Sequence, residues 1–174
     1  ERSIMNMPGR LRGLEGLIWS EELGLPTVVI NDAHAALLGE VWRGAASGDE
    51  NVLMVTLGTG VGGAAMVDGR LLRGHLGRAG HVGHISLNPD GAPDIVGTPG
   101  SLENMIGDCT VAERSGGRFQ STRDLVAAAV AGDSEAGQIW ARSVRALGAA
   151  LVSLINVLDP QTIVLGGGIA AAGD

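Results

Sequence analysis

A glycine-rich turn between two apolar runs, from Leu53 to Gly69, constrains the fold more than any other stretch of the sequence. The β-branched and aliphatic runs at 52–57 and 64–67 are typical of strands, and Asp68-Gly69 is a two-residue hairpin signal. The glycines between the runs lack Cβ atoms, so the main chain there can approach a ligand closely. Such a turn presents backbone N–H groups to an anion such as phosphate. A plain tight hairpin fits the same residues equally well, and both interpretations stay open at this point.

Short apolar runs and helical periods alternate along the rest of the chain. Buried strands are predicted at 27–30 and 161–165, and a further short strand at 82–87 within a long loop. Helical spacing of apolar residues predicts helices at 14–23, 33–43, 101–106, 125–131 and 133–158. This alternation of strand, turn and helix places the chain in the α/β class.

Composition excludes several classes of function. The 174 residues carry a net charge of -7 and only four aromatic side chains, which argues against a nucleic-acid-binding surface. A single cysteine, Cys109, excludes an intrachain disulfide and a thiolate metal cluster, and it fits a cytoplasmic protein. The longest apolar run, around 144–158, contains Arg145, Ser153 and Asn156, so we expect it to be too short and too patterned to cross a membrane.

The dipeptide Asn31-Asp32 is the first candidate for chemistry. It follows the strand predicted at 27–30, and ligands in open α/β sheets dock at the carboxyl ends of strands. An amide both donates and accepts hydrogen bonds, and a carboxylate can take a proton, so the pair suits a polyol whose hydroxyl attacks. The competing interpretation is that Asp32 only caps the helix that begins at Ala33, and the dipeptide alone favours it.

Histidines form the second candidate group. Three of the four, at positions 75, 81 and 84, lie within ten positions of one another in a glycine-rich loop, with Glu103 further on. No cysteine or well-spaced carboxylate completes a metal site with His81 and His84, so we predict no metal there. Hydrogen bonding to a polar ligand is favoured over metal binding, although a structural role is equally plausible for each histidine singly. His34 is expected to be structural.

Several motifs in order resemble the ROK family of bacterial sugar kinases, open reading frames and repressors. The strongest runs from Leu57 to His84, with Leu-Gly-Thr-Gly-Val-Gly-Gly-Ala-Ala, then Gly74, then Gly-His-Val-Gly-His. Asn6-Met-Pro8, Val28-Val-Ile-Asn-Asp-Ala-His-Ala-Ala36 and Asp159-Pro-Gln-Thr-Ile-Val-Leu-Gly-Gly-Gly-Ile169 resemble further family motifs. The resemblance therefore extends over nearly the whole chain.

The resemblance implies an actin-like, ribonuclease-H-like ATPase fold of two lobes, here incomplete. Residues 1–47 would end the N-terminal lobe, and residues 48–174 would form most of the larger C-terminal lobe. The implied activity is ATP-dependent phosphorylation of a hexose, of glucokinase type, with Mg²⁺ and with Asp32 as general base. Homo-oligomerisation is a further implication of the resemblance, while the composition predicts neither nucleic acid nor a membrane as partner of this segment.

The resemblance also implies roles for particular residues. Asn31 would hold sugar hydroxyls, and His84 and Glu103 match sugar-contacting positions. His81 stands where the family has a glutamate that accepts sugar hydroxyls, which puts glucose itself in doubt. The implied nucleotide and phosphate contacts are Gly58, Thr59 and Gly60 in the second phosphate loop, and Gly167 and Gly168 beside the nucleotide.

Two departures from the family pattern shape these expectations. The three cysteines of the family's zinc motif are replaced by Asp94, Val96 and Ser101, so we expect no structural zinc, with Pro93 and Pro99 stiffening the loop instead. The family's amino-terminal Asp-x-Gly-Gly-Thr loop is absent, so we expect a chain cut at both ends that is inactive alone. The main alternative is the sugar-sensing module of a ROK-type repressor, and the third is a catalytically dead α/β fold.

Overall fold

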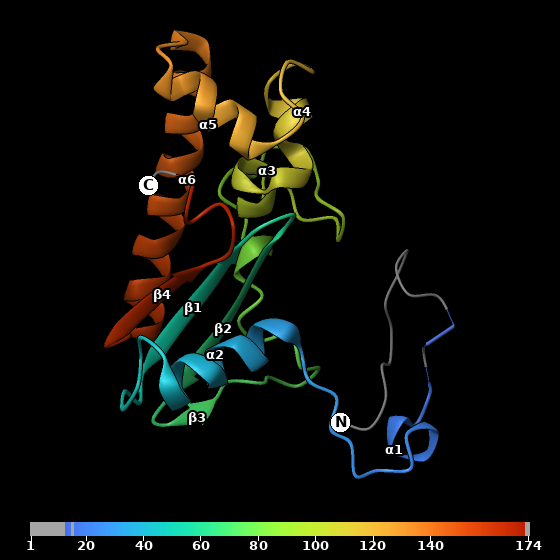
Figure 1. The fold of residues 1–174 in the computed structure, drawn as a ribbon. Coiled ribbons are helices and arrows are strands. Elements are labelled where there is room, and N and C mark those ends of the chain that lie inside the picture. Colours follow the sequence, from blue (N-terminus) through green and yellow to red (C-terminus); the bar gives the residue numbers. More distant parts are fainter. Residues whose placement is uncertain (1–12, 15, 173–174) are drawn as a thin grey trace.

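A four-stranded mixed sheet lies at the centre of the computed structural model, which describes residues 13–14 and 16–172 (Figure 1). The strand order is β3-β2-β1-β4, with β1 Val52–Leu57, β2 Val61–Val67, β3 Arg70–Leu71 and β4 Thr162–Gly166. β2 pairs antiparallel with β1 and β3, and β4 pairs parallel with β1. The predicted hairpin, its Asp68-Gly69 turn and the late strand are therefore confirmed.

The helices begin where side-chain oxygens accept backbone N–H groups. Ser101, Ser121 and Asp133 each accept the N–H three residues ahead, as N-cap residues do, and so start α3, α5 and α6. The α-helices are α1 Trp19–Glu22, α2 Asp32–Arg43, α3 Leu102–Ile106, α4 Val111–Arg114, α5 Thr122–Val130 and α6 Ser134–Leu158. Two 3₁₀ turns, η1 Val82–His84 and η2 Asp108–Thr110, complete the elements.

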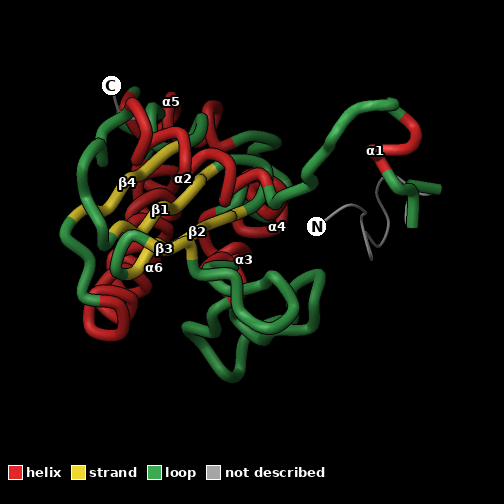
Figure 2. Tube along the Cα trace, turned by 90° about the horizontal axis from the view of Figure 1, so that it is seen from below, coloured by secondary structure: helices red, strands yellow, loops and turns green. Residues whose placement is uncertain are grey.

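Helices lie on both faces of the sheet (Figure 2). Side chains alternate along β1, so each face of the strand contributes to a different buried cluster. Leu53, Val55 and Leu57 belong to a buried cluster on which α6 packs through residues such as Leu147. The intervening β1 residues face the other way. Val52 and Met54 form a second buried cluster with Ala33 and Leu37 of α2, the alanines at 46 and 64, Met66 and Val164. The sheet thus lies between α2 and α6, and α2 shares a core with the hairpin.

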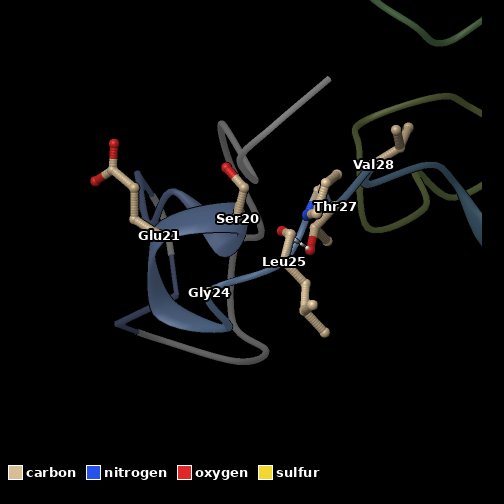
Figure 3. Close-up of a pocket in the computed structure, with 7 residues that line it drawn as sticks. Ser20, Glu21, Gly24, Leu25, Thr27 and Val28 are labelled. Carbon is tan, nitrogen blue, oxygen red and sulfur yellow. Dashed lines mark hydrogen bonds between the residues drawn. The ribbon is translucent and has the colours of Figure 1, made fainter.

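Two predicted strands are absent, and one predicted helix is shorter than expected. Residues 27–30 form no strand, since none of the strands that the structure describes pairs with them, and Val28 is 71% exposed. Instead, the Thr27 hydroxyl donates to the carbonyl of Leu25 at 2.9 Å within a pocket formed by this segment and α1 (Figure 3). The helix predicted at 14–23 is present only as α1, and the Asn6-Met-Pro8 motif lies outside the described residues.

The strand predicted at 82–87 is also wrong. The segment opens with η1, because the backbone of Gly83 packs directly on the carbonyl of Val61 in β2 and the chain turns there. Only one isolated bridge, between Ser86 and Ser101, extends it as a β contact.

Helix α6 has the predicted extent but is more apolar than expected. It spans 25 residues and, by length and composition, is apolar enough to cross a membrane, with a mean hydropathy of 1.4 over its best window. The expectation that its apolar run is too short and too patterned is therefore wrong. A single such helix is weak evidence for a membrane, because the core helix of a globular domain has the same composition. Part of its apolar surface, including Leu147, Leu151 and Leu154, packs on the sheet.

Candidate active site

The two glycine turns lie side by side at the carboxyl ends of the neighbouring strands β1 and β4. Because β1 and β4 are parallel, their carboxyl ends meet there, with Thr56 opposite Gly166. The N–H of Ile169 donates to the carbonyl of Leu57 at 3.1 Å and ties the second turn to the end of β1. Gly167 has a φ of +93°, and a Cβ there would collide with the same carbonyl, so only glycine fits this approach. Open α/β sheets bind ligands outside the carboxyl ends of their strands, which is where these two turns lie.

The loop 58–60 at the tip of the hairpin is held by its carbonyl groups. The N–H groups of Asp108 and Cys109, in η2, donate to the carbonyls of Gly58 and Thr59 at 3.0 and 2.8 Å. Within the loop, the N–H of Gly58 donates to the carbonyl of Gly60 at 3.0 Å. The N–H groups of Thr59 and Gly60 have no hydrogen-bond acceptor in the described part of the chain. Two backbone donors are thus left for an anion.

Glu103 supports this loop from α3. Its Oε2 accepts the N–H of Val61 at 2.9 Å, and it lies so close to Gly60 that a Cβ on that glycine would collide with it. Sequence reasoning assigned Glu103 to the sugar alone and missed this contact, which joins residues 42 positions apart. Its role toward a sugar stays a prediction.

We expect Glu103→Ala to lower the free energy of unfolding by about 1–3 kcal/mol, because it leaves the buried N–H of Val61 without an acceptor. Glu103→Gln keeps a carbonyl oxygen at this place and serves as the matched control, with a much smaller loss. Urea unfolding of both variants of the full-length protein checks this, and equal losses would contradict the anchoring role.

Asn31 and Asp32 lie at the start of α2, with separate tasks. Asn31 is the N-cap residue: its Oδ1 accepts the N–H of His34 at 3.2 Å. Asp32 is the first helical residue, and its Oδ1 accepts the N–H of Ala33 at 2.9 Å. The interpretation of Asp32 as the helix cap is therefore wrong. Its second carboxylate oxygen has no hydrogen-bond partner among the residues that the structure describes, and the side chain is exposed.

Three neighbouring cavities bring all ten predicted site residues together. A small one of about 130 Å³ is lined by Asn31, Asp32, His81 and His84 among others. A second, of about 370 Å³, is lined by Asp32, Glu103, Gly167 and the loop 58–60. The largest, of about 1080 Å³, shares Gly58 and Thr59 with the second and extends past Gly168 to α5. Asp32 therefore lies in the wall common to the first two cavities.

The histidines separate into three environments. Burial lowers the pKa of His81, as do the nearby His84, His34 and Arg78, against a smaller opposite effect of Asp32, so its imidazole is neutral at pH 7. His34 is buried with Nε2 3.3 Å from the carbonyl of Ala79, which confirms its structural role. His75 is exposed and lines a different cavity, with Arg73 and Gly77, so it does not join the group.

His84 has a partner that sequence reasoning missed. Its Nδ1 lies 2.8 Å from Oδ2 of Asp94, whose side chain is fully buried. Asp94 stands where the zinc motif that the sequence resembles has its first cysteine. That correspondence was the sequence signal that could have predicted a contact between Asp94 and His84. The bridge between Pro93 and Pro99 closes the same loop. Within 13–14 and 16–172, no three histidine, cysteine, aspartate or glutamate side chains cluster as metal ligands would.

Further residues of the largest cavity carried no signal in the sequence. Asp108 accepts the N–H of Thr122 at 2.6 Å through Oδ1 and so fixes the start of α5 beside the loop 58–60. The Thr122 hydroxyl is buried without a partner in the described part of the chain. Arg123, Val126 and Val130 of α5 complete this wall.

Comparison with known proteins agrees with this geometry. The model of the ROK family matches residues 4–174. A glucokinase of Halalkalibacterium halodurans is 38% identical over 88% of the chain and 52% of its own length, so the chain spans about half the length of this curated relative. Among solved structures, a ROK family glucokinase from Streptomyces griseus in complex with glucose and AMPPNP has a TM-score of 0.82 at 29% identity, covering 98% of this chain and 62% of that one.

A third match is a ROK family transcriptional regulator, a homolog of the E. coli MLC protein. It has a TM-score of 0.77 at 31% identity, over 88% of this chain and 42% of that one. The predicted actin-like ATPase fold is thus confirmed for the part that the chain covers. Since the family model matches nearly every residue, the chain belongs to the ROK family.

Proposed function

We propose that the protein transfers the γ-phosphoryl group of ATP to a hydroxyl of a hexose, as a glucokinase-type sugar kinase. The observation that carries this proposal is the place of Asp32, in the wall shared by a small polar cavity and the cavity of the loop 58–60. A sugar in the first cavity and a phosphate in the second would meet at this carboxylate.

Asp32 is the general base in this proposal. Its free oxygen accepts the proton of the attacking hydroxyl, while the bond from the Ala33 N–H holds the other oxygen in place. The side-chain carbonyl oxygen of Asn31 accepts the N–H of His34, so its NH₂ group is left to donate to a sugar hydroxyl. Neutral His81, which lines the same small cavity, accepts or donates a further hydrogen bond.

The nucleotide would lie along the other two cavities. The free N–H groups of Thr59 and Gly60 fit phosphate oxygens, and Gly167 and Gly168 would lie beside the nucleotide with α5. When bound, ATP with Mg²⁺ supplies the phosphoryl group and the charge that neutralises its oxygens. The protein's own part is to position the two substrates and to take up the proton.

The similarity to the Halalkalibacterium halodurans glucokinase and to the Streptomyces griseus enzyme with glucose and AMPPNP supports this proposal. Its test is a screen of hexoses and amino sugars with Mg-ATP on the full-length protein, with ADP release and the mass of the product as readouts. At least one sugar should yield a sugar phosphate. Sugar binding by calorimetry with no ADP from any sugar would overturn the kinase.

The second candidate is the sugar-binding module of a transcriptional regulator, which the similarity to the ROK family regulator favours. A regulator binds sugar without turning over ATP, so the same calorimetry and ADP assay separate the two. The carboxylate at position 32 and the free loop N–H groups favour the kinase, because a sensor needs neither a base nor a phosphate cradle.

A further inference from the structure

The contact between His84 and Asp94 joins the small cavity to a loop behind it. The imidazole of His84 is 25% exposed and lines the cavity with Asn31 and Asp32, while the side chain of Asp94 is 0% exposed. The Nδ1 to Oδ2 distance of 2.8 Å is that of a charge-assisted hydrogen bond. Asp94 itself cannot reach the cavity, so any effect it has on a ligand passes through His84.

The loop holds the carboxylate of Asp94 in one orientation. Its Oδ1 accepts the N–H groups of Val96 and Thr98, both at 2.9 Å, and its own N–H donates to the carbonyl of Thr98 at 2.9 Å. Oδ1 thus accepts two backbone N–H groups, and Oδ2 lies against His84. Burial raises the pKa of Asp94, but the hydrogen bonds from His84, Thr98, Ser101 and Val96 outweigh it and leave this pKa below its usual value.

An ionised carboxylate only accepts hydrogen bonds, so the ring nitrogen beside it must carry the proton. In a neutral imidazole with the proton on Nδ1, Nε2 is a bare acceptor. Nε2 of His84 has no hydrogen-bond partner in the part of the chain that the structure describes. The acceptor is therefore available to a ligand on the side of the ring away from Asp94.

We propose that Asp94 is a positioning residue that fixes His84 in the Nδ1–H tautomer and so presents Nε2 as an acceptor for one hydroxyl of the substrate. This inference rests on the proposed function for the identity of the ligand, but the tautomer itself does not. A hydroxyl that donates to Nε2 is oriented by the ring, and its oxygen lone pairs stay available to donors such as the Asn31 amide. Asp94 thus contributes to the choice of sugar from outside the cavity.

Asp94→Asn tests this with little change in shape. The two backbone N–H groups at Oδ1 require an oxygen there, so the NH₂ group of asparagine takes the place of Oδ2 and donates to Nδ1. The proton of His84 then moves to Nε2. ¹⁵N NMR of the histidine-labelled full-length protein at pH 8 reports this directly: we expect the Nδ1–H pattern for His84 in the wild type and the Nε2–H pattern in the variant.

Kinetics supply the second readout. We expect Asp94→Asn to raise the KM for the accepted sugar about tenfold, with the KM for ATP unchanged, because one substrate hydroxyl loses its acceptor. Asp90→Asn, which changes an exposed residue of the same loop, is the matched control and should leave both constants unchanged. A deoxy sugar that lacks this hydroxyl should bind the wild type and the Asp94→Asn variant equally weakly.

The outcomes separate the two proposals. An Nε2–H signal for His84 in the wild type overturns the role of Asp94, and this result needs no variant and no activity. A variant that keeps the Nδ1–H signal, or the wild-type sugar KM, overturns it as well. If the tautomers are as expected and no sugar is phosphorylated, the proposed function fails while the orientation of His84 by Asp94 stands.

Discussion

Asp32→Asn should lower kcat for sugar phosphorylation about 10²–10⁴-fold, the usual contribution of a general base. Asparagine is close to aspartate in size and its Oδ1 can still accept the Ala33 N–H, so the start of α2 should be unchanged. What is lost is the oxygen that takes the proton. Steady-state kinetics at saturating sugar and Mg-ATP measure the effect, and sugar affinity by calorimetry should change far less than kcat.

The matched control is Asp68→Asn. Asp68 follows β2, at the opposite end of this strand from the loop 58–60. Asp68 is an exposed turn residue with a φ of 49°, a conformation that asparagine tolerates well. It carries the same change of charge without touching any of the three cavities. An Asp32→Asn enzyme with the turnover of the control would remove Asp32 from the mechanism.

Gly83→Ala should cause a large loss of stability for the addition of a single methyl group. The added Cβ would lie on top of the carbonyl oxygen and carbon of Val61, which are backbone atoms of a residue that pairs with Leu57 of β1. Relieving this clash requires a shift of the backbone, so we expect a loss of about 3 kcal/mol in the free energy of unfolding. Thermal or urea unfolding of the full-length protein measures it.

Gly148→Ala provides the comparison. Gly148 lies within α6 and has no atom within 4 Å of an added Cβ, so alanine should raise stability by up to about 1 kcal/mol through helix propensity. Two glycine-to-alanine changes of opposite sign would support the close contact at Gly83. A neutral Gly83→Ala would mean that η1 and β2 are further apart than they are here.

The central part of the fold could be predicted because its signals are local. The apolar runs of β1 and β4 and the Asp68-Gly69 turn each specify their own conformation, and Ser101, Ser121 and Asp133 each accept an N–H three residues ahead. The run at 27–30 shows the limit of such signals. Its β-branched residues form a strand only if another strand pairs with them, and none of the described strands does.

The candidate site divides in the same way. Asn31, Asp32 and the two glycine turns were found because each is a compact motif, and the parallel pairing of β1 with β4 then brought the turns together. The supporting contacts could not be found, because each depends on the path of a loop. Glu103 reaches Val61 across 42 positions, and Asp94 meets His84 only because a tight turn at 94–98 points its carboxylate back.

The core that α2 shares with the hairpin bears on how the position of Asp32 is coupled to that of the loop 58–60. Ala33 and Leu37, just after Asp32, are buried against Val52 and Met54, the strand that leads into the loop 58–60. The carboxylate of Asp32 and the loop 58–60 therefore follow or precede elements that share one core, and this core couples their positions. Under the proposed function, a change in the spacing of base and phosphate loop would require this core to repack.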